Sequence, residues 1–378
     1  MTVEIVDALV QGQRGRRLLW EFMTAGEEES RTDISPHPLH EAMYYTSTRI
    51  DDLHYRGLES SAVIVEIEHT AREGAEKLAE LLEHTELFEV KHCMLQSALE
   101  SSVDAAMYWQ PPYGQEFVLA SPILRAQLDR IAKHIAASGQ IDYWVDPLDM
   151  AAQHRVNFDI TGSLAPAADK KRTGLESLIA WKDHVLRTEM RDARENQSRP
   201  LGNFSGEWWS APNMYLEETC GQFATAQPIG LICVEDGFGW EKATTRLVDI
   251  PASSNVLEIS SAEQWIRLCQ DHPIEVTAQK RHDWYQVTGR DGAWVIPDWL
   301  AVARNYDGVH LSIGAYLALA GECLPVDAEF STLIAGWDPG KTYWFIDGLL
   351  ESEQSQDWKC VDANSNTAHW VLDEGSTG

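Results

Sequence analysis

The stretch WVIPDWLAVARNYDGVHLSIGAY, residues 294–316, decides the fold of the second half of the chain. Its first part predicts a helix that begins at Pro297, carries apolar residues at helical spacing and ends at Gly308. A short strand is expected at 309–313, because apolar and polar residues alternate there. A second helical run is expected at 315–320. The stretch therefore predicts a strand held between two helices.

The alternation in this strand places His310 and Ser312 on the face opposite Val309 and Leu311. A histidine on a polar face is a candidate for proton transfer or ligand binding, because imidazole titrates near neutral pH. The alternative is a half-buried strand whose histidine only hydrogen-bonds a neighbour. The pattern alone leaves both interpretations open.

Composition and charge narrow the class of protein. The chain has 378 residues, of which 44% are hydrophobic and 24% are charged, as is usual for a folded protein of about two domains. Its 30 Lys and Arg against 59 Asp and Glu give a formal net charge of −29. Such a charge repels phosphate backbones and anionic membranes, so direct nucleic-acid or membrane binding is not expected. A basic protein partner would be attracted.

Tryptophan and cysteine add two further indications. The 15 tryptophans suit either core packing or a stacking surface for a ring ligand. The six cysteines are scattered, without a CxxC pair or a nearby histidine pair at metal-ligand spacing. This spacing argues against a zinc site and a disulfide framework, and no metal is predicted. No apolar run resembles a signal peptide or a membrane span, so a cytoplasmic location is expected.

The pattern divides the chain into four parts. We expect a mostly helical domain at 1–160, a linker and connecting helix at 161–200, an α+β domain with the candidate ligand site at 201–350, and an acidic tail at 351–378. In the first part, apolar and polar residues alternate at 62–68, which predicts a strand. Elsewhere in this part, apolar residues recur at helical spacing and predict helices. The expected fold class is α+β, with a small mixed or antiparallel β-core in the second half.

The second half changes to short apolar segments, glycines and aromatic residues. Strands are predicted at 206–212, 228–234, 244–250, 256–259 and 342–346. Between them, Ser261 and Gln264 form a capping-box pattern, which predicts a helix that ends near His272.

No familiar catalytic motif is present in the sequence. GxGxxG, GxxxxGK[ST], GxSxG and HExxH are all absent. Several carboxylates lie beside aromatic or apolar residues, namely Glu207, Glu235 and Glu258. A glutamate in apolar surroundings can act as a general acid or base, because burial raises its proton affinity. Each of these glutamates could also lie on a strand edge without any catalytic role.

The segments GEWWSAP, VLEISSAEQW, PDWLAVARNYDGVHLS and GWDPGKTYWF resemble divergent members of the ADP-ribosyltransferase-like superfamily over residues 201–348. The phrases RGRRLLWEF and SVDAAMYWQPP of the first half resemble uncharacterised actinobacterial proteins. In the superfamily, a split β-core binds NAD in a cleft and a glutamate stabilises the ribosyl cation. The resemblance implies a similar core and NAD as a possible substrate here.

On this resemblance, Trp208 and Trp209 would stack on the nicotinamide and Ser210 would offer a hydroxyl. His310 or Glu258 would face the ribose as the catalytic residues. The resemblance thus implies an NAD-consuming transferase or glycohydrolase, acting on a macromolecular or small acceptor. The alternative is a non-catalytic acidic binding or inhibitor protein that engages a basic partner. Carbohydrate binding through tryptophans and carboxylates is a third hypothesis, although no secretion signal accompanies it.

Overall fold

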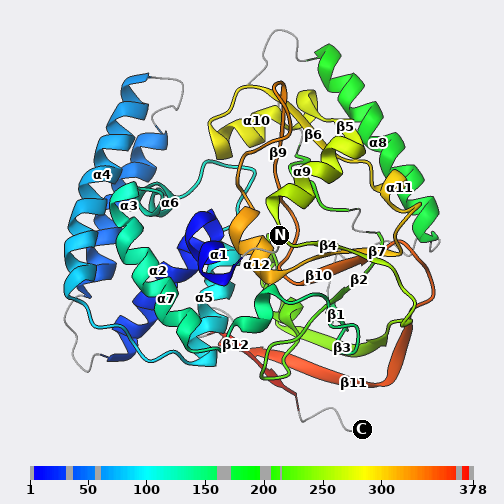
Figure 1. Ribbon diagram of the computed structural model, residues 1–378, viewed down its shortest axis with the longest axis horizontal. Helices are drawn as coiled ribbons and strands as arrows, with labels where there is room; N and C mark the ends of the chain where they lie inside the picture. The colour runs from blue at the N-terminus through cyan, green and yellow to red at the C-terminus, as the bar shows by residue number, and fades with distance from the viewer. Residues whose placement is uncertain are drawn as a thin grey trace.

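The computed structural model describes residues 4–30, 37–55, 61–159, 172–195, 206–212, 215–362 and 368–373. The protein has an α+β fold, as predicted, with a helical part beside a sheet (Figure 1). The helical part consists of α1 (Ile5–Gln11), α2 (Gln13–Ser30), α3 (Pro38–Tyr55), α4 (Ser61–His84), α5 (His92–Asp104), α6 (Gly114–Leu119) and α7 (Arg125–Ala137), with short 3-10 turns at Pro122–Leu124 and Asp142–Val145.

The strand predicted at 62–68 is wrong, because this segment lies inside α4. The alternation there covers two turns only, whereas the buried residues Ile67, Ala71, Leu78 and Leu82 continue at helical spacing for the rest of the 24-residue helix. The helical spacing decides the structure, because it places the apolar residues on one face of α4 that packs against the other helices. Val65 is left exposed on the outer face.

An eight-stranded sheet forms the other part of the molecule, in the order β12-β11-β3-β1-β2-β10-β7-β4. The strands are antiparallel except for the parallel pair β4 and β7. Their bounds are β1 His154–Phe158, β2 Glu217–Cys220, β3 Lys242–Asp249, β4 Val256–Ile259, β7 Gly308–Leu311, β10 Lys341–Trp344, β11 Leu350–Val361 and β12 His369–Leu372. The strand β1 comes from the half that we expected to be helical.

Three of the five strands predicted in the second half are confirmed, and each of them pairs with a neighbouring strand of the main sheet. The segments 244–250, 256–259 and 342–346 correspond to β3, β4 and β10. The prediction at 206–212 is wrong, since no residue of this segment belongs to a strand. The prediction at 228–234 is also wrong, because a 3-10 turn at Ile229–Leu231 interrupts it.

The tail from residue 351 also differs from the prediction, because it supplies β11 and β12. The strand β11 pairs with β3 on one side and β12 on the other. Most of its side chains are exposed, so its composition is polar although its backbone belongs to the sheet.

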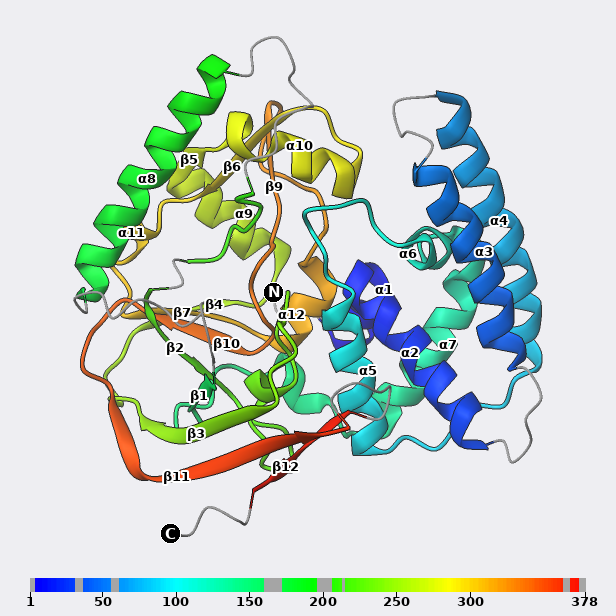
Figure 2. The same cartoon turned by 180° about the vertical axis from the view of Figure 1, so that it is seen from behind.

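A smaller sheet with the order β5-β6-β9-β8 lies beside the main one. It consists of β5 (Pro273–Glu275), β6 (Ala293–Pro297), β8 (Leu324–Pro325) and β9 (Phe330–Thr332). The helices α8 (Gly174–Glu195), α9 (Ala262–Asp271), α10 (Thr277–Thr288) and α11 (Trp299–Val302) surround it, with α8 on the outer side (Figure 2).

The helix signals of the second half are read correctly to within a few residues. Ser261 caps α9 as predicted, with its hydroxyl accepting from the Gln264 amide. Pro297 instead ends β6 and Asp298 caps α11, so this helix begins at Trp299, two residues later than predicted, and it ends at Val302, several residues before Gly308. The predicted linker at 161–172 lies outside the described residues except for Arg172. Within the described part of the chain, none of the helices combines the length and apolar character that a membrane crossing requires.

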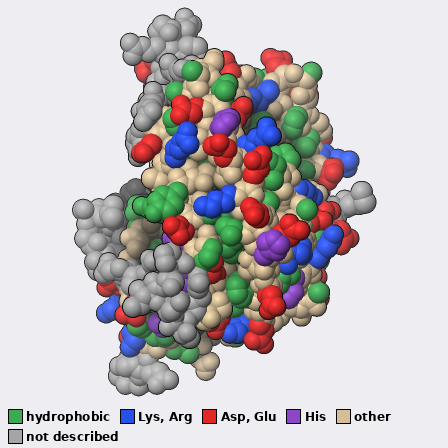
Figure 3. Space-filling view, turned by 90° about the vertical axis from the view of Figure 1, so that its left-hand side faces the viewer, with side chains coloured by type: hydrophobic (Ala, Val, Ile, Leu, Met, Phe, Trp, Pro, Cys, Tyr) green, Lys and Arg blue, Asp and Glu red, His purple; other side chains and the backbone are tan. Residues whose placement is uncertain are grey.

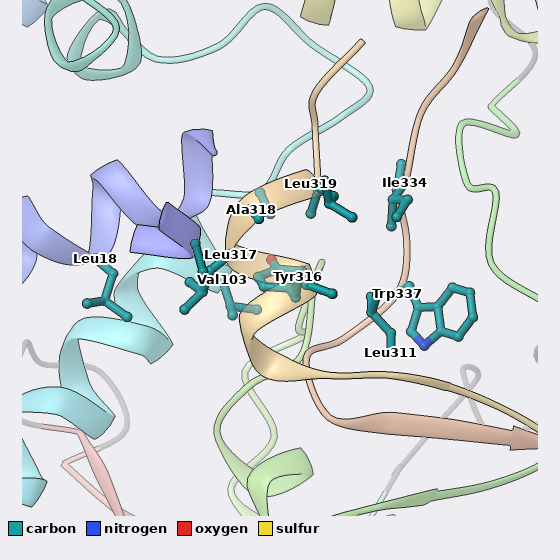
Figure 4. Packing of buried hydrophobic residues seen from close by; sticks show 14 of the residues in the cluster. Leu18, Val103, Leu311, Tyr316, Leu317, Ala318, Leu319, Ile334 and Trp337 are labelled. Atoms are coloured by element: carbon teal, nitrogen blue, oxygen red, sulfur yellow. The ribbon is translucent and has the colours of Figure 1, made fainter. Parts of the chain in front are cut away.

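The helix α12 (Ile313–Leu319) joins the two parts, and all seven of its residues are buried. Leu317 is directed towards Leu18 and Val103 of the helical part, while Ile334 and Trp337 lie on the other side of α12 (Figure 4). One hydrophobic cluster contains residues from both parts. The two predicted domains therefore share a continuous core.

We predict that Gly12→Ala destabilises the protein by about 2–3 kcal/mol, as expected for overpacking. Gly12 separates α1 from α2, and a Cβ there would lie 2.0 Å from the Leu317 carbonyl oxygen of α12. Thermal unfolding should show a melting temperature several degrees lower. Gly237→Ala is the matched control, because its Cβ would meet no atom closer than 3.5 Å. Equal melting temperatures for the two variants would contradict this account.

Candidate functional site

The predicted catalytic residues Glu258 and His310 lie on neighbouring strands. They are register partners in the parallel pair β4 and β7, so their side chains leave the same face of the sheet. Thr342 of β10 is the next residue in this row, opposite His310. The structure therefore brings together the two residues that the resemblance implied as catalytic.

Both side chains are held in polar contacts. The Glu258 Oε1 atom accepts from the Leu148 amide at 3.0 Å, while Oε2 is buried without a partner among the described residues. His310 Nδ1 lies 2.9 Å from the Thr342 hydroxyl. Burial raises the pKa of Glu258 and lowers the pKa of His310 to about 4. The imidazole is therefore neutral at physiological pH.

The predicted cofactor-binding residues Trp208, Trp209 and Ser210 lie elsewhere. Ser210 is fully buried, and its hydroxyl accepts from the Ala335 amide at 3.1 Å. The Trp208 ring is buried with its centroid 5.0 Å from that of Trp109. Trp209 is the most exposed of the three, at 37%. Two of these residues are thus used in packing.

The sheet separates the two groups of predicted site residues. Val309 and Leu311 alternate with His310 and belong to the main hydrophobic cluster, which also contains Trp208. His310 and Glu258 face the opposite side, where Leu148 and Trp344 form part of a smaller cluster. The five residues do not line one common site.

A cleft of about 520 Å³ lies between the helical part and the second half. One wall consists of residues from α2, α4 and α6, and the other of the end of α10 and residues 321–323. Figure 2 shows α10 on one side and α4 and α6 on the other. The volume is within the range of about 300–1,000 Å³ typical of small-ligand sites.

The lining of the cleft combines acidic and apolar groups. Its charged residues are one arginine, Arg16, and three glutamates, Glu68, Glu116 and Glu322. Arg16 is already paired, with its Nη2 atom 3.3 Å from Glu322 Oε1. Aromatic residues include Phe117 and Tyr285. We name this feature the acidic cleft.

Glu116 is the best-defined polar group of the acidic cleft. Its side chain is 4% exposed, and its Oε1 atom lies 2.7 Å from Arg14 Nη2 and 3.3 Å from Arg17 Nη1. Its Oε2 atom is buried and lacks a hydrogen-bond partner within the described part of the chain. The carboxylate is thus held by two arginines of α2 and belongs to the floor of the cleft rather than to its open surface.

A group of buried polar side chains lies behind the acidic cleft, between the helical part and α12. It comprises Arg14, Tyr108, Glu235 and Tyr316, each less than 10% exposed. Burial, followed by the negative charge of Asp338, raises the pKa of Glu235 to about 8. Burial and Glu235 likewise raise the pKa of Tyr316 well above its usual value. Strongly perturbed groups of this kind are frequent at functional sites.

Sequence reasoning did not find this arrangement. The only signals were arginines inside an apolar N-terminal pattern and the acidic pair Glu235-Asp236 after an apolar segment. Arg14 and Glu116 are 102 positions apart, and no local pattern relates them. Within the described residues, no group of three or more His, Cys, Asp or Glu side chains is placed to hold a metal ion.

We compared the chain with known protein families, curated proteins and solved structures. No protein-family model, curated protein or solved structure matches this chain.

Proposed function

We propose that the protein is a non-catalytic binding protein whose acidic cleft takes a basic, partly apolar segment of a partner protein. The observation that carries the proposal is the cleft of about 520 Å³, whose charged lining consists of three glutamates and one arginine and includes the exposed Glu68. A lysine or arginine side chain would donate to the Glu68 carboxylate, and its aliphatic stem would contact the apolar wall.

The charges of the molecule support a cationic ligand. The cleft holds three glutamates and one arginine, and the whole chain carries −29. Acidic and basic side chains are interspersed on the face of the molecule in Figure 3, so the net charge does not form a single patch on this face. The field of the whole protein would attract a basic partner, and the cleft would select which segment binds.

The first test is binding of a peptide of alternating lysine and leucine, measured by calorimetry. We expect Ala120→Trp to weaken binding about tenfold or more, because Ala120 lines the cleft and an indole would fill part of it. Binding should also weaken as salt is raised, through screening. A peptide with glutamate in place of lysine should not bind.

The matched control is Ala137→Trp, at an exposed position of α7 that does not line the cleft. It adds the same side chain and should bind like the unchanged protein. If both tryptophan variants bind equally well, the peptide is held by the acidic surface in general and the cleft is not the site.

The second candidate is an NAD-consuming ADP-ribosyltransferase-like activity, favoured by the adjacency of Glu258 and His310 in the β4–β7 register. The Glu258 carboxylate, whose Oε2 atom accepts no hydrogen bond from the described residues, lies beside a neutral imidazole and could offset positive charge on a ribosyl group. Trp208, Trp209 and Ser210 would then act at a distance from the reacting centre, as part of the fold. NAD would be the substrate, and no metal is required for this chemistry.

We expect, on this second candidate, that the protein releases nicotinamide from NAD and that Glu258→Gln lowers the rate about a hundredfold or more. Glu263→Gln is the control, because Glu263 lies five positions further on and is exposed at the start of α9. Nicotinamide release can be followed by chromatography. Absence of turnover in the unchanged protein would exclude the activity.

Both candidates are proposed for a reducing, cytoplasmic setting. All six cysteines are free thiols, and three of them, Cys220, Cys233 and Cys269, are buried. Thiols that remain unpaired suit a compartment in which disulfides are rare.

A further inference from the structure

The helix α8 has apolar residues on two sides. Its inner side, with Leu178, Trp181 and Val185, is buried against the rest of the molecule. Its outer side exposes four large apolar side chains. They are Leu175, Ile179, Leu186 and Met190, with exposed fractions of 57%, 51%, 43% and 53%. A helix that packs on one surface needs only one apolar side, so the outer side carries apolar area that the fold does not use.

The four exposed side chains form one strip along the helix. Positions four or seven residues apart lie on the same side of an α-helix, and these four fall within a sector of about 60°. Met190 follows Leu175 by 15 positions, so the strip is about 22 Å long. In both Figure 1 and Figure 2, α8 forms an outer edge of the molecule, and no other described element covers this side. We name this feature the α8 strip.

The spacing within the α8 strip is the same in both directions along the helix. Its intervals are four, seven and four residues. A two-fold axis at the middle of the strip would therefore bring Ile179 of one copy opposite Leu186 of a second copy, and Leu175 opposite Met190. A contact between identical chains around a two-fold axis requires this self-complementarity, because both copies use the same surface. A different partner protein would not require it.

The charges of α8 allow two copies to meet, although the whole chain carries −29. With histidine counted as neutral, α8 has four basic and five acidic side chains, which gives a formal net charge of −1. At the middle of the strip, the Asp183 carboxylate pairs with the Arg187 guanidinium at 2.9 Å. A basic partner would be attracted to the acidic remainder of the molecule and not to this nearly neutral helix.

We propose that the α8 strip is the contact between two copies of this chain, whose α8 helices pack antiparallel across a two-fold axis. Two apolar strips of this length bury an area at the lower end of specific interfaces, so we expect a reversible dimer with a Kd on the order of 10–100 µM. The dimer is independent of the function proposed above, because no residue of α8 lines the acidic cleft.

Sedimentation equilibrium of the full chain, from about 1 to 300 µM, tests the proposal. We expect the average mass to rise towards that of a dimer. Ile179→Lys should weaken association about tenfold or more, because it places an ammonium group in both halves of the contact. Val65→Lys is the matched control and should associate like the unchanged protein. Val65 is also β-branched and 63% exposed on a helix, but α4 lies on the opposite side of the molecule (Figure 1).

A mixture of two variants tests the antiparallel register. Leu186→Glu alone should weaken association as Ile179→Lys does. In an equimolar mixture, each heterodimer places the new lysine opposite the new glutamate and keeps the unchanged Leu186 opposite the unchanged Ile179. We therefore expect the mixture to dimerise more tightly than either variant alone. A parallel pair of helices gives no such rescue, because each position then lies opposite its own copy.

The proposal is overturned if the unchanged chain stays monomeric over this range, if Ile179→Lys and Val65→Lys associate equally well, or if the mixture associates no better than its components. All three substituted side chains are exposed, so the melting temperatures of the variants should match that of the unchanged protein. Raised salt gives an independent check. It should maintain or strengthen the dimer, because screening reduces repulsion between two acidic copies. A dimer that dissociates as salt is raised would be held by charges and not by the α8 strip.

Discussion

The close packing of α12 against the α1–α2 junction is the constraint on which the rest of the structure depends. Every residue of α12 is buried, and the absence of a side chain at Gly12 lets the two backbones meet. Burial of a leucine-sized side chain contributes roughly 2 kcal/mol, so Leu317 and Leu319 alone account for a considerable stabilisation. The same contact fixes the walls of the acidic cleft relative to each other, since one wall continues from α2 and the other follows α12.

The sequence predicts those elements whose signals are local. The cap of α9 at Ser261, the strand β4 and the strand β7 follow from residue patterns that span only a few positions. The segment 62–68 misleads because two turns of a helix can imitate alternation. The strand β11 is missed because its side chains are mostly exposed, and its backbone pairing with β3 leaves no apolar pattern to read.

The candidate site is predictable only in part, because strand register and contacts between distant residues decide it. Glu258 and His310 stand 52 positions apart in the sequence, and the parallel register of β4 and β7 makes them neighbours. The resemblance implies that Trp208 belongs to the same site as His310. In the structure, Trp208 belongs to the hydrophobic cluster that contains Val309 and Leu311, whose side chains leave β7 on the face opposite His310. The Arg14–Glu116 pair joins α2 and α6, and no local sequence pattern relates these two helices. An arginine among apolar residues indicates only that a buried acidic partner exists, without saying which residue it is.

The position of β1 in the sheet sets a condition on synthesis of the chain. This strand lies between β3 and β2, which begin at residues 242 and 217, whereas β1 ends at residue 158. At a translation rate of about 5–20 residues per second, β1 waits several seconds before its first partner exists. Its sequence, HRVNF, places Arg155 and Asn157 among its apolar residues. A strand of this composition is a poor template for aggregation, so the central strand can remain unpaired on the ribosome without harm until its neighbours are made.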